Sequence, residues 1–199
     1  MFDKSPYLMP IQHAACMAGE KESPGEVLQA FKMDQDGVAN AIGFHAGIFN
    51  KVDYFLIHNH TVQLIELSDL KECIEKNHTY ITKELDELKT AIEKESQLQG
   101  VPIREITTDE KKEIVKTAWK KDRDELCNKW SGSIAVIERL YRKTIESPDS
   151  DPRYQLLIVC RNHTDIKMID SLKNQLSGMM GNVKVCNTQT LKSQLIKIE

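Results

Sequence analysis

Residues 51–68 read KVDYFLIHNHTVQLIELS, which is two apolar segments separated by a polar pair. β-Branched and aromatic residues on both sides of a two-residue turn, Asn59-His60, predict a β-hairpin. Its strands are expected at about Val52–Ile57 and Val62–Leu67. In such a hairpin, facing residues have numbers that add up to 119, as 59 and 60 do.

This register places two carboxylates, Asp53 and Glu66, directly opposite each other on one face of the hairpin. Such partners have Cβ atoms about 5 Å apart, and like charges at this distance repel. A bound metal ion would remove the repulsion. Three interpretations stay open: an active metal site, the relic of one, and strand-end carboxylates that face solvent or pair with Lys51.

Both faces of the hairpin are apolar, which is typical of a strand pair covered on both sides. Further elements are expected before and after it. The sequence therefore predicts an α/β fold with a central mixed sheet flanked by helices, within one domain over residues 1–199. The core is expected at residues 24–68 and 154–186. Its other elements are helices at about Pro24–Met33 and Asp165–Leu176, and strands at about Val38–Phe49, Tyr154–Cys160 and Val183–Cys186.

Residues 69–146 change to a helical period, with apolar residues three or four positions apart. A helix of about 30 residues is expected to end at Gly100-Val-Pro102, and Thr107 with Glu110 forms a capping box for the next helix. This second helix should run to about Glu146, with Ser131-Gly132 as a kink. The two form an inserted antiparallel pair. Its tryptophans, Trp119 and Trp130, either pack between the helices or belong to a surface for a protein partner or homodimer.

Charge is distributed unevenly along the chain. Residues 1–68 carry four lysines and eight acids, whereas residues 153–199 carry seven basic and three acidic groups. An acidic metal site beside a phosphate-binding surface would give this pattern, and so would an ordinary solvated surface. Five widely spaced cysteines, no leader and no apolar run of membrane-spanning length indicate a reduced, cytoplasmic protein without a membrane partner.

The order of elements, with Asp53 in one hairpin strand and Glu66 in the next, resembles the restriction-endonuclease-like superfamily, the PD-(D/E)XK nucleases. The family pattern continues with a lysine two residues after the second acid, where this chain has Ser68. The resemblance implies Asp53 and Glu66 as catalytic ligands of Mg²⁺ or Mn²⁺, and Glu26 as an accessory metal ligand. Because Lys51 faces Ser68 in the expected register, it is the first candidate for a relocated lysine. Lys71, Arg139 and Lys143 follow it.

The resemblance implies a metal-dependent nuclease that hydrolyses DNA or RNA. The alternative is a non-catalytic, nuclease-like adaptor that holds a protein partner through residues 69–146, for example in an antiviral defence complex. Arg161 and Thr164, between a strand and a helix, are candidates for phosphate binding. The letters His58-Asn59-His60 match the HNH nuclease class, but that class has these residues at separated positions.

Overall fold

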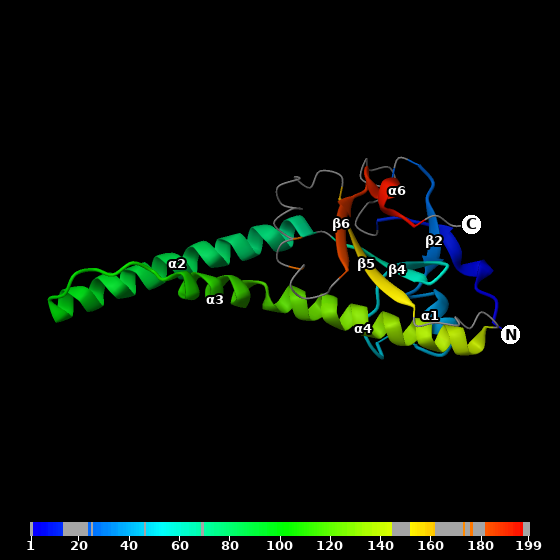
Figure 1. Cartoon of the computed structure of the whole chain (residues 1–199), viewed down its shortest axis with the longest axis horizontal. Coiled ribbons are helices and arrows are strands. Elements are labelled where there is room, and N and C mark those ends of the chain that lie inside the picture. The colour runs from blue at the N-terminus through cyan, green and yellow to red at the C-terminus, as the bar shows by residue number, and fades with distance from the viewer. Residues whose placement is uncertain are drawn as a thin grey trace. The chain divides into compact units, whose positions relative to one another are not determined.

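A computed structural model of the protein shows an α/β fold with a six-stranded mixed sheet flanked by helices (Figure 1). It divides into two compact units, Met1–Leu70 with Glu125–Glu199, and Lys71–Asp124. The residues that the structure describes are 2–13, 24, 26–45, 47–68, 70–144, 152–161, 173, 176 and 182–196.

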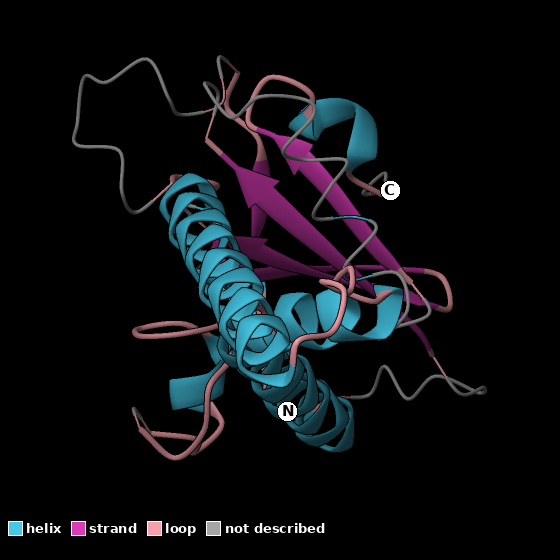
Figure 2. Ribbon diagram, turned by 90° about the vertical axis from the view of Figure 1, so that its left-hand side faces the viewer, coloured by secondary structure: helices cyan, strands magenta, loops and turns pink. Residues whose placement is uncertain are grey.

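The sheet belongs to the first unit, and its strands are neighbours in the order of the sequence. The first four pair antiparallel, whereas β4 with β5 and β5 with β6 pair parallel. Figure 2 shows the strands as one twisted layer. The strands are β1 (Leu8–Pro10), β2 (Gln29–Lys32), β3 (Tyr54–His58), β4 (Thr61–Leu67), β5 (Arg153–Cys160) and β6 (Val183–Asn187).

The hairpin prediction is confirmed. β3 and β4 pair from Tyr54 with Ile65 to His58 with Thr61, which is the expected register. Asn59 adopts a φ of 51°, the left-handed conformation that a tight two-residue turn requires. The strands predicted around residues 154–160 and 183–186 are confirmed as β5 and β6.

Two predictions for the segment before the hairpin are wrong. Residues 29–32, expected within the helix Pro24–Met33, form β2, and the expected strand Val38–Phe49 instead begins with a short helix, α1 (Val38–Ala41). Pairing with two neighbours, β1 and β3, supplies the hydrogen bonds of β2. These long-range bonds outweigh the local helix signals, because helix propensity is a weak preference that tertiary context overrides.

Both faces of the sheet are covered. On one face, the helix α4 (Lys120–Lys143) packs through its later residues: Trp130 meets the ring of Tyr154 edge-on, and Glu138 accepts a hydrogen bond from the Tyr154 hydroxyl. On the other face lies an apolar core to which the short helix α6 (Leu191–Gln194) contributes. This core contains Ile11, Ala30, Tyr54, Leu56, Ile65, Leu157, Val159, Cys186 and Leu191.

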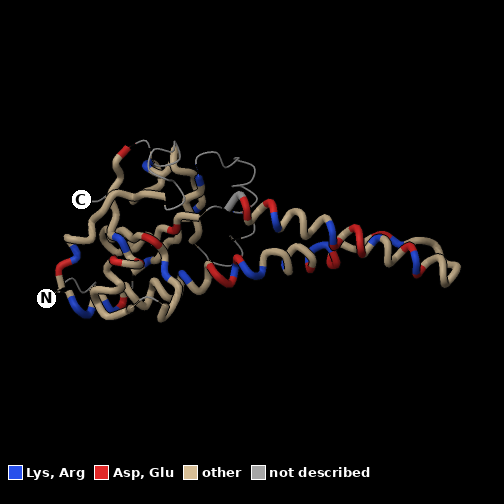
Figure 3. The backbone as a smooth tube through the Cα atoms, turned by 180° about the vertical axis from the view of Figure 1, so that it is seen from behind, with Lys and Arg blue, Asp and Glu red and all other residues tan. Residues whose placement is uncertain are grey.

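The second unit is helical. It contains most of α2 (Leu70–Gln99), all of α3 (Thr108–Ala118) and the start of α4. The Thr107–Glu110 capping box is present. Along these helices Lys and Arg alternate with Asp and Glu, as Figure 3 shows.

The expected single helix from 108 onward is broken at Trp119 rather than kinked at Ser131-Gly132, through which α4 continues. Trp119 is buried, and Trp130 is half-buried and packs on Tyr154. Most of the predicted helix Asp165–Leu176 lies outside the described residues. No disulfide joins the described cysteines, Cys73, Cys127, Cys160 and Cys186, to one another. Among the described helices, none is long and apolar enough to cross a membrane.

Candidate functional site

Three charged side chains from separate parts of the first unit meet beside the sheet. Asp53 directly precedes β3, Glu66 lies in β4, and Lys129 comes from α4. The Lys129 Nζ atom donates a hydrogen bond of 2.5 Å to Glu66 Oε1. Glu66 is only 3% exposed, and Asp53 is half-buried. We call these residues the Asp53–Glu66–Lys129 cluster.

Small residues in α4 allow the helix to approach the segment that leads into β3. A Cβ atom on Gly132 would lie 2.1 Å from the Asn50 carbonyl oxygen, so only glycine fits there. The backbone N–H of Val52 donates to Ser133 Oγ at 3.0 Å, and this hydroxyl donates to the Lys129 carbonyl at 2.7 Å. These contacts fix the turn of α4 that carries Lys129 against the chain just before Asp53.

The carboxylate oxygens of the cluster differ in their hydrogen bonds. Asp53 Oδ2 accepts from the backbone N–H of Leu67 at 2.8 Å, and Glu66 Oε1 is bonded to Lys129. Glu66 Oε2 is buried and has no hydrogen-bond partner among the described residues. A buried carboxylate oxygen without a partner is costly, and a bound ion or water is the usual explanation.

Burial shifts the acid–base equilibria of the cluster. Burial and the Asp53 carboxylate together raise the pKa of Glu66 to about 8, although Lys129 acts in the opposite direction. Burial also raises the pKa of Asp53 above its usual range, against the effects of the Leu67 N–H and Lys129. For Lys129, burial favours the neutral form, but Glu66 outweighs it and the pKa is raised overall. Lys129 therefore stays charged over the physiological range of pH.

The raised pKa of Glu66 predicts that the metal-free protein loses stability as pH rises. Below about pH 4.5 the carboxyl is protonated in both states, whereas between 4.5 and about 8 the folded state binds the proton more strongly. The free energy of unfolding should therefore fall between pH 6 and 8, by up to about 1.4 kcal/mol per pH unit. Urea unfolding in EDTA measures this fall, which should be much smaller in Glu66→Gln. Equal slopes in the two proteins would contradict the assignment.

Lys51, the lysine predicted to serve the site, has other partners. Its ammonium donates to the Phe49 carbonyl at 2.9 Å and lies 3.3 Å from Asp34 Oδ1. It therefore neutralises Asp34, whose charge acts on Asp53 and raises its pKa. Among the described residues, the lysine in contact with Glu66 is Lys129.

The other predicted site residues are not brought to the cluster. Glu26 lies in a bend rather than a helix and forms an exposed ion pair with Lys192, 2.5 Å away. Arg161 directly follows β5, and Thr164 lies outside the described residues. Arg139 and Lys143, the weaker lysine candidates, are exposed on the last turns of α4.

The hairpin motif gives no indication of Lys129, because this lysine lies on a face of α4. It lies on a stripe whose other members are buried, at spacings of three and four residues along α4. A lysine inside such a stripe requires an acidic partner, since an unpaired buried charge is costly. The stripe therefore indicates that Lys129 has an acidic partner. Its buried members are Leu126, Ser133, Val136 and Leu140.

The donor set of the cluster suits a hard divalent cation. No group of three or more His, Cys, Asp or Glu residues with metal-binding geometry occurs among the described residues. Mg²⁺, however, keeps several waters and binds through one or two carboxylates plus substrate phosphate. Asp53 and Glu66 meet that requirement, and Glu66 Oε2 is a buried oxygen without a hydrogen-bond partner among the described residues.

Comparison with known proteins gives the chain no relatives. No protein-family model matches it, and neither a curated protein nor a solved structure does.

Proposed function

We propose that the chain is a metal-dependent nuclease that hydrolyses phosphodiester bonds of DNA or RNA. The proposal rests on one observation. Two carboxylates, Asp53 and Glu66, lie beside the Lys129 ammonium in a partly buried site. The pairing of acids across a hairpin beside a lysine is the arrangement that the restriction-endonuclease-like nucleases share. Here the lysine would come from a helix instead of from the strand.

The sheet supports a restriction-endonuclease-like core as part of the proposal. β2, β3 and β4 form an antiparallel meander, and β5 then adds in parallel beside β4. The two acids sit at the end of the β3–β4 ladder, next to the parallel half of the sheet. The pairing of β3 with β4 ends at Tyr54. Asp53 therefore lies just outside the strand, where its side chain can reach a bound ligand.

Each residue has a chemical task in this proposal. Asp53 and Glu66 would hold Mg²⁺ or Mn²⁺, which when bound polarises a phosphodiester and lowers the pKa of an attacking water. Lys129 would orient that water or stabilise the charge that develops on the phosphate. The raised pKa of Glu66 implies that cation binding releases a proton, because the ligand must be ionised to coordinate.

Cleavage assays with three variants test the proposal. Labelled DNA and RNA are incubated with wild-type protein in Mg²⁺, Mn²⁺ or EDTA. Asp53→Asn, Glu66→Gln and Lys129→Met should each lower the cleavage rate by about 100-fold or more, since each removes a group that acts on the reacting phosphate. Calorimetric titration with Mn²⁺ provides a second readout. The two carboxylate variants should not bind Mn²⁺.

Lys121→Met is the matched control, because it removes an exposed lysine from the same helix. It should cleave at the wild-type rate. Circular dichroism establishes that each variant is folded before its activity is interpreted. A folded wild-type protein that neither binds Mn²⁺ nor cleaves nucleic acid would refute the proposal.

A second candidate function, a protein-binding adaptor, is favoured by exposed apolar side chains at the end of α2 and in its connection to α3. Leu98 is 88% exposed, and Val101 and Ile103 are also exposed there. Monomeric proteins rarely leave large apolar side chains grouped in solvent without a partner. A folded protein without metal binding or cleavage would favour this second function.

A further inference from the structure

A basic pocket lies on the first unit at the C-terminal end of α4. Its volume is about 640 Å³, within the range of sites for small molecules and nucleotides. Phe44 and Ala135 provide its apolar surface. Three cations and one acid complete the lining: Arg139, Arg142, Lys143 and Glu138.

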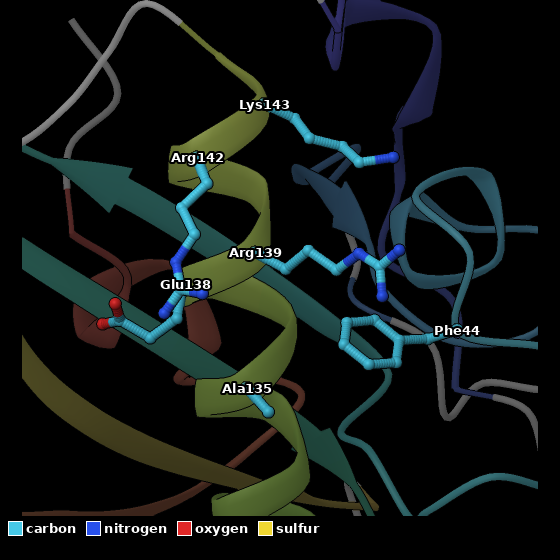
Figure 4. Close-up of a pocket in the computed structure, with 6 residues that line it drawn as sticks. All are labelled: Phe44, Ala135, Glu138, Arg139, Arg142 and Lys143. Carbon is cyan, nitrogen blue, oxygen red and sulfur yellow. The ribbon is translucent and has the colours of Figure 1, made fainter.

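The pocket has a net positive charge that its own acid does not cancel. Arg139 stacks on the Phe44 ring, with its guanidinium carbon 4.8 Å from the ring centre. Figure 4 shows Arg139 and Lys143 extending from α4 toward the segment that carries Phe44. Glu138 accepts a hydrogen bond from the Tyr154 hydroxyl at 2.8 Å, so one of its oxygens is already engaged.

Stacking pre-orients the arginine. A guanidinium held flat on an aromatic ring loses less conformational entropy when it binds an anion, and its planar donors match phosphate oxygens. Lys143 is exposed on the side of α4 to which Arg139 points, whereas Arg142, which is also exposed, extends toward Glu138 (Figure 4). An anion with several phosphate groups fits this combination better than a single carboxylate.

We infer that this pocket binds backbone phosphates of the nucleic-acid strand whose cleavage is proposed for the Asp53–Glu66–Lys129 cluster. The inference rests on the proposed function, since it makes α4 carry both the lysine of the cluster and the binding pocket. At about 1.5 Å per residue, Lys143 lies about 20 Å beyond Lys129 along the helix axis. One strand of a duplex covers that length with about six phosphates.

Binding measured without metal tests the pocket separately from cleavage. The ligands are fluorescent single-stranded DNA, duplex DNA and RNA of about 20 nucleotides, longer than the span of α4. In EDTA, Arg142→Gln/Lys143→Gln should weaken binding roughly tenfold at low salt. The slope of log affinity against log salt should decrease by about 1.4 for a single strand.

Lys112→Gln/Lys116→Gln is the matched control, because it removes the same charge from exposed positions on α3. It should bind as wild type. Equal weakening in both double variants, or none in the pocket variant, would overturn the inference. So would a pocket variant that loses binding to poly-glutamate but not to oligonucleotides, since the pocket would then accept an acidic peptide.

The two proposals fail in different ways. A protein that binds oligonucleotides through the pocket but cleaves none refutes only the nuclease. A protein that cleaves, and whose KM does not change in Arg142→Gln/Lys143→Gln, refutes only the pocket.

Discussion

Replacing Gly132 with alanine is expected to lower the free energy of unfolding by about 1–3 kcal/mol, although alanine is the better helix former. The added Cβ would lie 2.1 Å from the Asn50 carbonyl oxygen and 2.8 Å from the Phe49 ring. A backbone oxygen cannot move aside as a flexible side chain can. The helix must therefore shift, which strains the Ser133 hydrogen bond to Val52 and moves Lys129 away from Glu66.

Ser131→Ala serves as the control for this prediction. Ser131 is the exposed neighbour in the same helix, and alanine there should stabilise by a few tenths of a kcal/mol through helix propensity alone. Urea unfolding of the two variants separates close packing from propensity. If Gly132→Ala were as stable as wild type, α4 would not approach the Asn50 segment as closely as the structure shows.

The hairpin could be predicted from the sequence because its information is local. Asn59-His60 between two apolar segments fixes the turn, and the turn fixes which residue faces which. The same local reading fails for residues 29–32. Their strand exists because β1 and β3 lie on either side, and no short window of sequence contains those partners.

The candidate site shows the same division. Asp53 and Glu66 share a hairpin, so their meeting follows from the register. Lys129 reaches Glu66 from 63 residues away, through a glycine contact that only the folded chain reveals. The sequence does show one part of this arrangement: Lys129 is a charged residue on a helical stripe whose other members are buried.

Replacing Lys129 with methionine is expected to destabilise the protein by about 3 kcal/mol at pH 9 and by much less at pH 6. Methionine keeps the volume of the side chain but leaves Glu66 without its cation. At pH 6 the Glu66 carboxyl is protonated, since its pKa is already raised to about 8, and little charge is left unpaired. At pH 9 the variant must either keep an ionised carboxylate buried beside Asp53 or bind a proton that the wild type does not need, because Lys129 no longer lowers the pKa of Glu66. Urea unfolding at the two pH values measures the difference.

Glu66→Gln should destabilise the protein less than Lys129→Met does. The Lys129 side chain is 23% exposed and keeps a second partner, Glu125, 3.3 Å away. The double variant Glu66→Leu/Lys129→Met completes a thermodynamic cycle. Buried ion pairs replaced together by apolar residues often leave stability unchanged or increased. A stable double variant that no longer binds Mn²⁺ would show that the pair contributes chemistry rather than stability. A double variant as unstable as Lys129→Met, in a protein whose wild type binds no Mn²⁺, would make the pair structural, and Asp53 would then lose its proposed role.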